Sequence, residues 1–481
     1  MIKLSIPLFN RRDIMKVLSK TTPIISYLIL LIAVQSAWSK SIINLPWQPD
    51  SPVQIDGKLS QTKLVQHGAN TVFLDMTITP PSVPAHISQQ RATDMIIVLD
   101  RSGSMSEAKK MPFAKAAIWD VLGRLNEEDR FALVSFSDNA IVQSPLVNVS
   151  AGTRNYLNNV VSSIKASGGT NMEAGLNSAL ALLQENHSER ARKILLLSDG
   201  QANQGMTNPH QLAQLATKAT HYGAVLSSIG MGLGFNENLM SKLADHGMGH
   251  YSYLEDLSGL SSILARDLED TRNIYANSST LEINLAEGVK LIDAGGYPLT
   301  HSGPSTIRVA TGQMLANTQK HFVMTFNVPT GNIGSITLGS MKLNYQVQGE
   351  QLQTTVNSES LILAVVEPKY RIQAQKSIDK NIYQNSWVEN NLGRMKKKIS
   401  RWMREGKKDQ AKQEINEYRK EIKAASVRSN LPLVSAEMNG KLEAMEDEVD
   451  EAFLGSSMEQ QVKQNRAAKS MQYDSIKKQR K

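Results

Sequence analysis

Five oxygen-bearing side chains follow, or lie between, two short apolar runs in the first half of the chain. They are Asp100, Ser102, Ser104, Thr170 and Asp199. The first three alternate directly after the apolar run 95–99, and the last follows the run 194–197. Carboxylates and hydroxyls are hard oxygen ligands of the kind that Mg²⁺ prefers in proteins. These residues therefore predict a Mg²⁺ site, with Mn²⁺ or Ca²⁺ as alternative occupants.

The elements expected around these residues would bring them to one place. From residue 94 to about residue 270, short apolar runs alternate with amphipathic stretches, which is typical of a parallel sheet with helices on both faces. The expected strands are Met95–Asp100, Arg130–Phe136, Lys193–Ser198, Ala224–Ile229 and Tyr251–Leu254. The expected helices are Phe113–Leu125, Tyr156–Ile164, Glu173–Leu183, Gln211–Thr220, Asn238–Ala244 and Leu257–Leu268. Because open α/β sheets bind ligands beyond the carboxyl ends of their strands, the predicted ligands share that edge.

Three short motifs resemble the metal-ion-dependent adhesion site of von Willebrand factor A (VWA) domains and integrin inserted domains. They are DRSGS at 100–104, GGT at 168–170 and SDG at 198–200. The resemblance implies a Rossmann-like VWA domain over residues 92–272. It also implies that Asp100, Ser102, Ser104, Thr170 and Asp199 hold one magnesium ion, directly or through water, and that an acidic side chain of a protein partner fills the open position. For the first motif alone, the alternative is a strand-end turn whose serines cap the next helix.

Three further residues have two interpretations each. Arg101, inside the first motif, either attracts the partner's acid or is simply solvated. His246 and His250 frame a glycine-containing turn, but no third ligand lies near them in sequence, so we interpret them as structural rather than metal-binding. The chain has no HExxH, GxSxG or P-loop motif, and the predicted metal site has no general base beside it, so we expect no enzymatic activity.

Alternating patterns flank the α/β segment on both sides. Apolar residues recur at every second position in 72–78 and again in 341–347, which predicts strands with one buried face. We expect residues 40–91 and 273–367 to form one antiparallel β-sandwich into which the α/β domain is inserted. The alternative is two independent β segments, but about 50 residues of β structure alone bury too little surface to be stable.

The composition changes to helix-forming residues after residue 367. Apolar residues at helical spacing predict an α-helical region over 368–460. The basic end, 461–481, lacks apolar residues to pack and is predicted to be a disordered tail that could touch an anionic envelope surface.

The charge of +8 is unevenly distributed. Residues 1–39 carry five Lys/Arg and one Asp, and residues 391–481 carry 21 Lys/Arg and 14 Asp/Glu, so the middle of the chain is net acidic. An acidic middle argues against a nucleic-acid partner. There are no cysteines, which excludes disulfides and thiolate metal sites.

The first 39 residues predict export. Basic residues precede the apolar run 23–34, and small residues at 37 and 39 suit cleavage of a signal peptide, 1–39. The alternative is an uncleaved anchor, and the paired Arg11 and Arg12 leave ordinary and twin-arginine secretion both open. We expect a mature chain without a transmembrane span, in the periplasm or at the surface of a bacterium. Its expected role is metal-dependent protein binding; the alternative is a scaffold subunit that presents clients to a partner ATPase or other enzyme complex.

Overall fold

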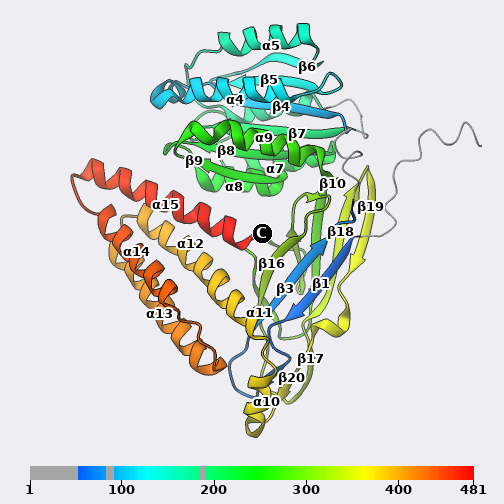
Figure 1. Cartoon of the computed structure of the whole chain (residues 1–481), viewed down its shortest axis with the longest axis vertical. Coiled ribbons are helices and arrows are strands. Elements are labelled where there is room, and N and C mark those ends of the chain that lie inside the picture. Colours follow the sequence, from blue (N-terminus) through cyan, green and yellow to red (C-terminus); the bar gives the residue numbers. More distant parts are fainter. Residues whose placement is uncertain (1–52, 83–90, 184–189, 481) are drawn as a thin grey trace, which may run out of the picture. The chain divides into compact units, whose positions relative to one another are not determined.

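The computed structural model describes residues 53–82, 91–183 and 190–480. A six-stranded sheet forms the centre of the α/β segment (Figure 1). The strand order is β6-β5-β4-β7-β8-β9, and every neighbouring pair is parallel except β5 and β6. The strands are β4 (Thr93–Asp100), β5 (Arg130–Phe136), β6 (Ala140–Asn148), β7 (Ala191–Ser198), β8 (Ala224–Met231) and β9 (Met248–Leu254). The five expected strands are confirmed. The strand β6 is not predicted by the sequence, because it lies at the edge of the sheet, carries no regular apolar alternation and has mostly exposed or half-buried residues.

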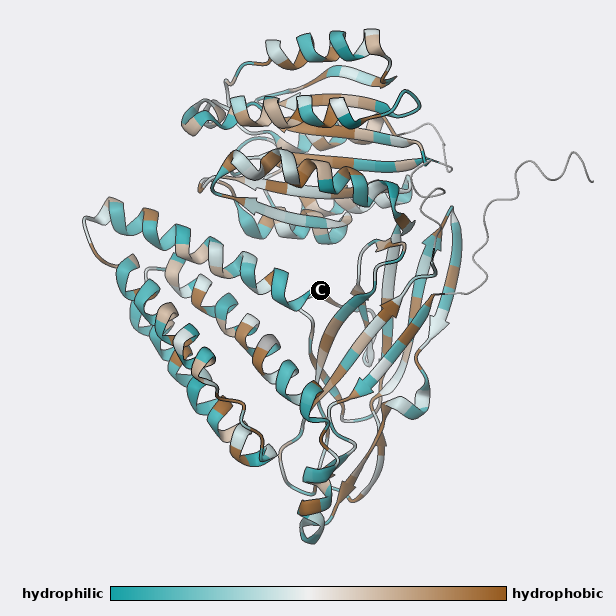
Figure 2. Cartoon of the chain, in the orientation of Figure 1, coloured by the Kyte–Doolittle hydropathy of each residue, from teal (hydrophilic) through white to brown (hydrophobic). Residues whose placement is uncertain are grey.

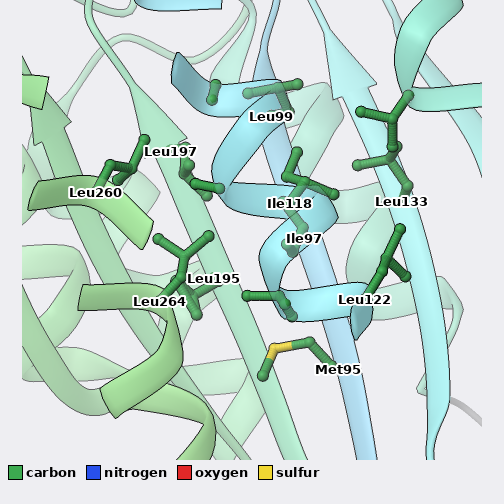
Figure 3. Packing of buried hydrophobic residues seen from close by; sticks show 14 of the residues in the cluster. Met95, Ile97, Leu99, Ile118, Leu122, Leu133, Leu195, Leu197, Leu260 and Leu264 are labelled. Carbon is green, nitrogen blue, oxygen red and sulfur yellow. The ribbon is translucent and has the colours of Figure 1, made fainter. Parts of the chain in front are cut away.

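Helices cover both faces of this sheet. Alternate side chains of a strand point to opposite faces. Met95, Ile97 and Leu99 of β4 join one core (Figure 3). Ile96 and Val98 of the same strand join the other core. The first core is covered by α4 (Lys110–Arg124), α5 (Ala151–Ser163) and α9 (Leu260–Arg272). The second is covered by α6 (Met172–Ala181), α7 (Pro209–His221) and α8 (Glu237–His246). Hydrophobic residues are concentrated along the strands, and the outer helix surfaces are largely hydrophilic (Figure 2).

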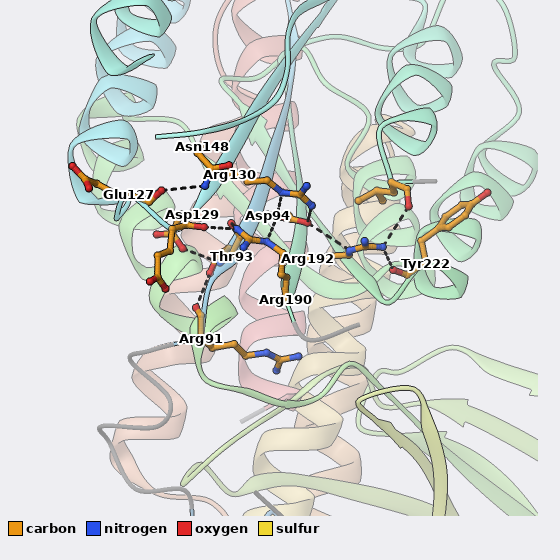
Figure 4. A network of polar contacts seen from close by, with 12 residues as sticks. Arg91, Thr93, Asp94, Glu127, Asp129, Arg130, Asn148, Arg190, Arg192 and Tyr222 are labelled. Carbon is orange, nitrogen blue, oxygen red and sulfur yellow. Dashed lines mark hydrogen bonds and ion pairs between the residues drawn. The ribbon is translucent and has the colours of Figure 1, made fainter. Parts of the chain in front are cut away.

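A buried ion-pair network ties together the amino ends of the central strands (Figure 4). Asp94 is fully buried, and its carboxylate accepts hydrogen bonds from Arg130 at 2.6 and 2.8 Å and from Arg190 at 2.5 Å. Arg192 lies 3.6 Å from the same carboxylate. Burial by itself raises the pKa of Asp94. The hydrogen bonds and charges of Arg130 and Arg190 have the opposite effect, and together they bring the pKa below its usual range. This network lies at the opposite ends of the strands from the predicted metal site.

Strands from both sides of the α/β segment join in one sheet. The strand β3 precedes the α/β segment and pairs antiparallel with β16, which follows it, in the order β1-β3-β16-β12. These strands are β1 (Gln54–Leu59), β3 (Thr71–Thr79), β12 (Lys290–Ala294) and β16 (Lys320–Asn327). The α/β domain is therefore inserted between strands of one antiparallel sheet, and the alternative of two independent β segments is wrong.

Three further sheets complete the β structure. A five-stranded antiparallel sheet has the order β13-β14-β11-β18-β19 and comprises Leu299–His301, Thr306–Ala310, Ser278–Leu285, Gly339–Val347 and Glu350–Thr355. A three-stranded sheet has the order β17-β20-β2 and comprises Gly334–Thr337, Ile362–Val366 and Lys63–Val65. The short strands β10 (Ile274–Ala276) and β15 (Met314–Leu315) form a pair.

The C-terminal region is helical, as expected, but it extends further than the sequence predicts. Its helices are α10 (Arg371–Lys376), α11 (Lys380–Asn385), α12 (Asn391–Arg404), α13 (Lys408–Ser429), α14 (Ala436–Ala452) and α15 (Ser457–Gln479). The prediction of a disordered tail is wrong for residues 461–479, which lie in α15. Ala467 and Ala468 are buried, and the backbone oxygen of Ala468 accepts a hydrogen bond of 2.7 Å from Ser400 of α12. Small side chains allow this close approach, so the helix packs although it has few large apolar residues.

Two predictions about membranes and export have different outcomes. None of the helices within residues 53–82, 91–183 and 190–480 combines the length and hydrophobicity that a membrane-spanning helix requires. The predicted signal peptide, residues 1–39, lies outside the described residues and stays a prediction.

Candidate metal site

The five predicted residues lie together at the carboxyl edge of the sheet, although they come from three separate stretches of chain. Asp100 is the last residue of β4, and Asp199 directly follows β7, which pairs with β4 in parallel. Ser102 and Ser104 lie in the segment between β4 and α4, and Thr170 lies just before α6. Parallel pairing thus aligns the two carboxylates at the ends of neighbouring strands.

Hydrogen bonds link the first aspartate, the two serines and the second aspartate. The backbone N–H of Ser102 donates to Oδ1 of Asp100 at 2.8 Å. The hydroxyl oxygens of Ser102 and Ser104 lie 3.2 Å apart, and Ser104 donates to Oδ1 of Asp199 at 2.8 Å. Four of the five side chains therefore lie in one connected group.

Gly200 lies where Thr170 approaches the first aspartate. A Cβ atom at Gly200 would lie 3.2 Å from Oγ1 of Thr170 and 3.8 Å from Oδ2 of Asp100. Both oxygens therefore lie close to the same position. Larger residues at position 200 would compete with the threonine hydroxyl for this space. The fifth predicted residue therefore joins the other four.

The turn before Thr170 is held by backbone contacts with the first motif. Gly168 has a φ of 82°, a left-handed conformation that favours glycine, and a Cβ there would collide with the carboxylate of Asp138. The backbone oxygen of Gly168 accepts a hydrogen bond of 3.0 Å from the N–H of Gly103. The N–H of Thr170 donates to Oδ1 of Asn203 at 2.8 Å. The fold of the site therefore requires glycine at position 168.

Asp100 is completely buried, which makes its negative charge costly without a cation nearby. Burial is the largest effect and raises the pKa of Asp100 to about 6. Hydrogen bonds from Ser198, at 2.6 Å to Oδ2, and from Ser102 lower the pKa, whereas the charge of Asp199 raises it. A buried carboxylate with a second carboxylate beside it is suited to bind a cation.

This donor set fits a divalent metal ion. Two carboxylates and three hydroxyls converge from separate elements, and all five are hard oxygen donors of the type that Mg²⁺ prefers. The two carboxylates formally balance a charge of +2, and the three hydroxyls add no charge.

Comparison with known proteins adds a family to this geometry. The model of the von Willebrand factor type A domain matches residues 94–266. These residues form a VWA domain. Such domains are protein-interaction modules that commonly bind a divalent metal ion at a site of this kind, and they are generally not enzymes.

Two bacterial proteins are similar to this chain in sequence, and one protein of solved structure is similar to it in fold. The chain is 28% identical over 179 residues to YfbK of Escherichia coli, covering 37% of this chain but only 31% of that protein. It is 23% identical over 301 residues to sll0103 of Synechocystis, covering 59% of this chain and 70% of that protein. The structure of a von Willebrand factor type A protein from Catenulispora acidiphila has a TM-score of 0.63 with 17% identity, covering 90% of this chain and 99% of that one. At this identity the structural likeness shows the fold alone.

The VWA domain contains two polar residues near the metal site that the sequence analysis did not assign to it. Ser198 donates to Asp100, and Asn203 orients the backbone of Thr170. The position of Ser198 at the end of a strand, next to a predicted ligand, was a usable signal. Asn203 has no such signal, because only the folded loop brings it to Thr170.

Lys110 also lies at this edge of the VWA domain, and the sequence analysis missed it as well. Its ammonium group lies 2.5 Å from Oδ2 of Asp199 and 3.2 Å from the backbone oxygen of Ser104. It begins α4 and is buried. The sequence around Lys110 does not indicate that this side chain contacts Asp199.

His246 and His250 of the VWA domain lie on different elements. His246 ends α8, two residues beyond the expected end of this helix, and its Nδ1 lies 3.2 Å from the hydroxyl of Thr217. His250 lies on β9, with Nε2 3.0 Å from the side-chain nitrogen of Gln313. Within the described ranges, no three His, Asp or Glu side chains cluster as metal ligands would.

Arg101 is half-buried and donates to Ser167 at 3.3 Å, so it is not simply solvated.

Proposed function

We propose that this protein is a metal-dependent protein-binding module that acts in adhesion or assembly in the bacterial envelope and is not an enzyme. In this proposal, Asp100, Ser102, Ser104, Thr170 and Asp199 hold one Mg²⁺ ion. The observation that carries it is the convergence of these five oxygen donors at one edge of the sheet. A bound divalent ion would supply an open coordination position that suits a carboxylate oxygen of a protein partner.

The residues of the site each have a role in this function. The two aspartates supply the charge that attracts a cation, and the three hydroxyls supply neutral oxygens. Ser198 and the backbone N–H of Ser102 orient the carboxylate of Asp100, because each donates to a different oxygen of it. This arrangement of oriented oxygen donors favours binding over chemistry.

Location in the envelope rests on the chain's first residues and on its composition. Basic residues followed by an apolar run are typical of export signals. The absence of cysteine is compatible with an oxidising compartment. Export, the periplasm or the cell surface of a bacterium, and a possible contact of basic residues with an anionic envelope surface remain part of the proposal.

The metal assignment is tested by titrating the purified protein with Mg²⁺ in a calorimeter. We expect saturable binding by the wild type and a loss of about tenfold or more in Thr170→Val and Ser104→Ala, since each variant removes one oxygen donor. Ser106→Ala is the matched control, because this exposed serine lies in the same segment and donates only to Gly103. Unchanged Mg²⁺ affinity in both site variants would refute the ligand assignment.

The partner-binding part is tested by affinity capture from an envelope extract. Captured proteins that depend on the site should disappear when EDTA is added and should also be lost with Thr170→Val. A protein that is retained under both conditions binds another surface. If every captured protein is retained, metal-dependent binding is wrong.

A further inference from the structure

A buried lysine lies beside the two carboxylates of the VWA metal site. Lys110 is 8% exposed, and its Nζ donates to Oδ2 of Asp199 at 2.5 Å and to the backbone oxygen of Ser104 at 3.2 Å. Asp199 is 1% exposed. Lysine is rarely buried unless it is paired. The contact between Lys110 and Asp199 is therefore a buried ion pair and differs from an ordinary surface pair.

The backbone before Lys110 adopts an unfavourable conformation that leads into this position. Ala108 has a φ of 48° and Lys109 a φ of 57°, so two successive residues that are not glycine are left-handed. A left-handed backbone is unfavourable for a residue that carries a Cβ atom. Strain of this kind persists only where the surrounding structure imposes it, and it is concentrated at functional sites.

The loop after β8 leaves room for the lysine side chain. Gly232 has a φ of 72°, and a Cβ there would lie 3.2 Å from Cε of Lys110. A left-handed backbone and the close side chain both disfavour a larger residue at this position. Two separate segments, one before α4 and one after β8, therefore accommodate the same lysine.

Both oxygens of Asp199 have hydrogen-bond partners within the chain. Oδ1 accepts from Ser104, and Oδ2 accepts from Lys110. While Lys110 holds Oδ2, Asp199 cannot chelate an ion with both oxygens. The ammonium also reduces the formal charge of the two carboxylates from −2 to −1.

We propose that Lys110 is a specificity-determining residue of this site, an internal cation that weakens binding of a bare metal ion and strengthens binding of an anionic ligand beside it. This inference rests on the proposed metal site. With two aspartates and one lysine, a site that holds a divalent ion keeps one net positive charge. That charge favours a carboxylate from a partner over a neutral ligand. The alternative is a purely structural ion pair that holds the start of α4.

The test compares Lys110→Met with Lys109→Met. Both variants remove one positive charge from the chain, but Lys109 is exposed. Mg²⁺ is titrated into each protein in a calorimeter, with and without saturating acetate as the anionic probe. We expect Lys110→Met to bind Mg²⁺ about tenfold more tightly than the wild type, since one nearby unit charge is removed. Acetate should strengthen Mg²⁺ binding by the wild type and Lys109→Met, and less so by Lys110→Met.

Two further variants keep the result interpretable. Lys110→Arg retains the charge and should restore the acetate effect. Lys110→Gln removes the charge but keeps hydrogen-bond donors for Asp199, so it replaces Lys110→Met if the latter does not fold. If the wild type binds no Mg²⁺, the proposed metal site itself fails. If the wild type binds Mg²⁺ and the uncharged Lys110 variants match it in both titrations, the metal site stands and the role of Lys110 is refuted.

Discussion

Lys469 of α15 donates a hydrogen bond of 2.6 Å to the backbone oxygen of Phe235, and its ammonium lies 4.0 Å from the centroid of the Phe235 ring. Phe235 lies in the loop between β8 and α8, next to Gly234. A Cβ at Gly234 would come within 2.8 Å of the backbone oxygen of Asp199. The helix α15 therefore contacts a loop that packs against the proposed metal site.

Glu237, at the start of α8, pairs with cations from two C-terminal helices. Its carboxylate lies 2.7 Å from Lys469 of α15 and 2.5 Å from Arg404 of α12. Tyr473 of α15 stacks edge-on against Tyr251 and Tyr253 of β9. The described residues belong to one compact unit, so these contacts join α15 to the VWA domain within it.

Replacing Lys469 tests whether α15 is bound to the VWA domain. Lys469→Met leaves the oxygen of Phe235 without its partner and Glu237 with Arg404 alone, so we expect the free energy of unfolding to fall by about 1–3 kcal/mol. Urea denaturation measures this change. Lys463→Met, on the exposed side of the same helix, should change it by less than about 0.5 kcal/mol. Equal stability of the two variants would favour the disordered tail that composition predicts.

Gly200→Ala tests the contact between Thr170 and Asp100 without removing a ligand. The added methyl would lie 3.2 Å from the threonine hydroxyl, so Thr170 must shift by a few tenths of an ångström. We expect weaker Mg²⁺ binding in calorimetry with little loss of stability, since Gly200 does not have a left-handed backbone. Gly123→Ala is the control, because nothing lies within 4 Å of its added Cβ. Identical Mg²⁺ affinities in both variants would mean that Thr170 is not a ligand.

Asp94→Asn tests the buried network at the other end of the sheet. It leaves three arginines without their carboxylate, and we expect a loss of about 3–5 kcal/mol in the free energy of unfolding. The folded pKa of Asp94 lies below its usual value of 3.8. The wild type should therefore keep this stabilisation above about pH 4 and lose it as the pH falls through the folded pKa. The variant should lack that acid-sensitive component.

Urea denaturation at several pH values between 3 and 7 measures both effects of Asp94→Asn. Asp120→Asn is the control, because its side chain is 37% exposed and pairs with Arg124 one helical turn away. Exposed pairs of this type contribute less than about 1 kcal/mol. A pH dependence that is unchanged in Asp94→Asn would assign the acid sensitivity to other carboxylates.

The sequence by itself determined the α/β fold and predicted the five residues of the proposed metal site. Alternating apolar runs and amphipathic stretches predict strands and helices because burial on both faces of a parallel sheet requires that order. The alignment of Asp100 and Asp199 at one edge then follows from parallel pairing of their strands. Local pattern was sufficient for these two aspartates because each lies at or next to a strand end.

Only the tertiary structure decided which residues support the site and how the C-terminal end packs. Lys110 contacts Asp199 because left-handed residues redirect the chain, and Asn203 contacts Thr170 because two loops meet. Neither contact has a local sequence signal. The helix α15 packs through small residues, buried charges and tyrosine contacts, which an apolar pattern does not detect. These features depend on partners far away in sequence, because a buried charge or a small side chain is stabilised only by the group that folding brings against it.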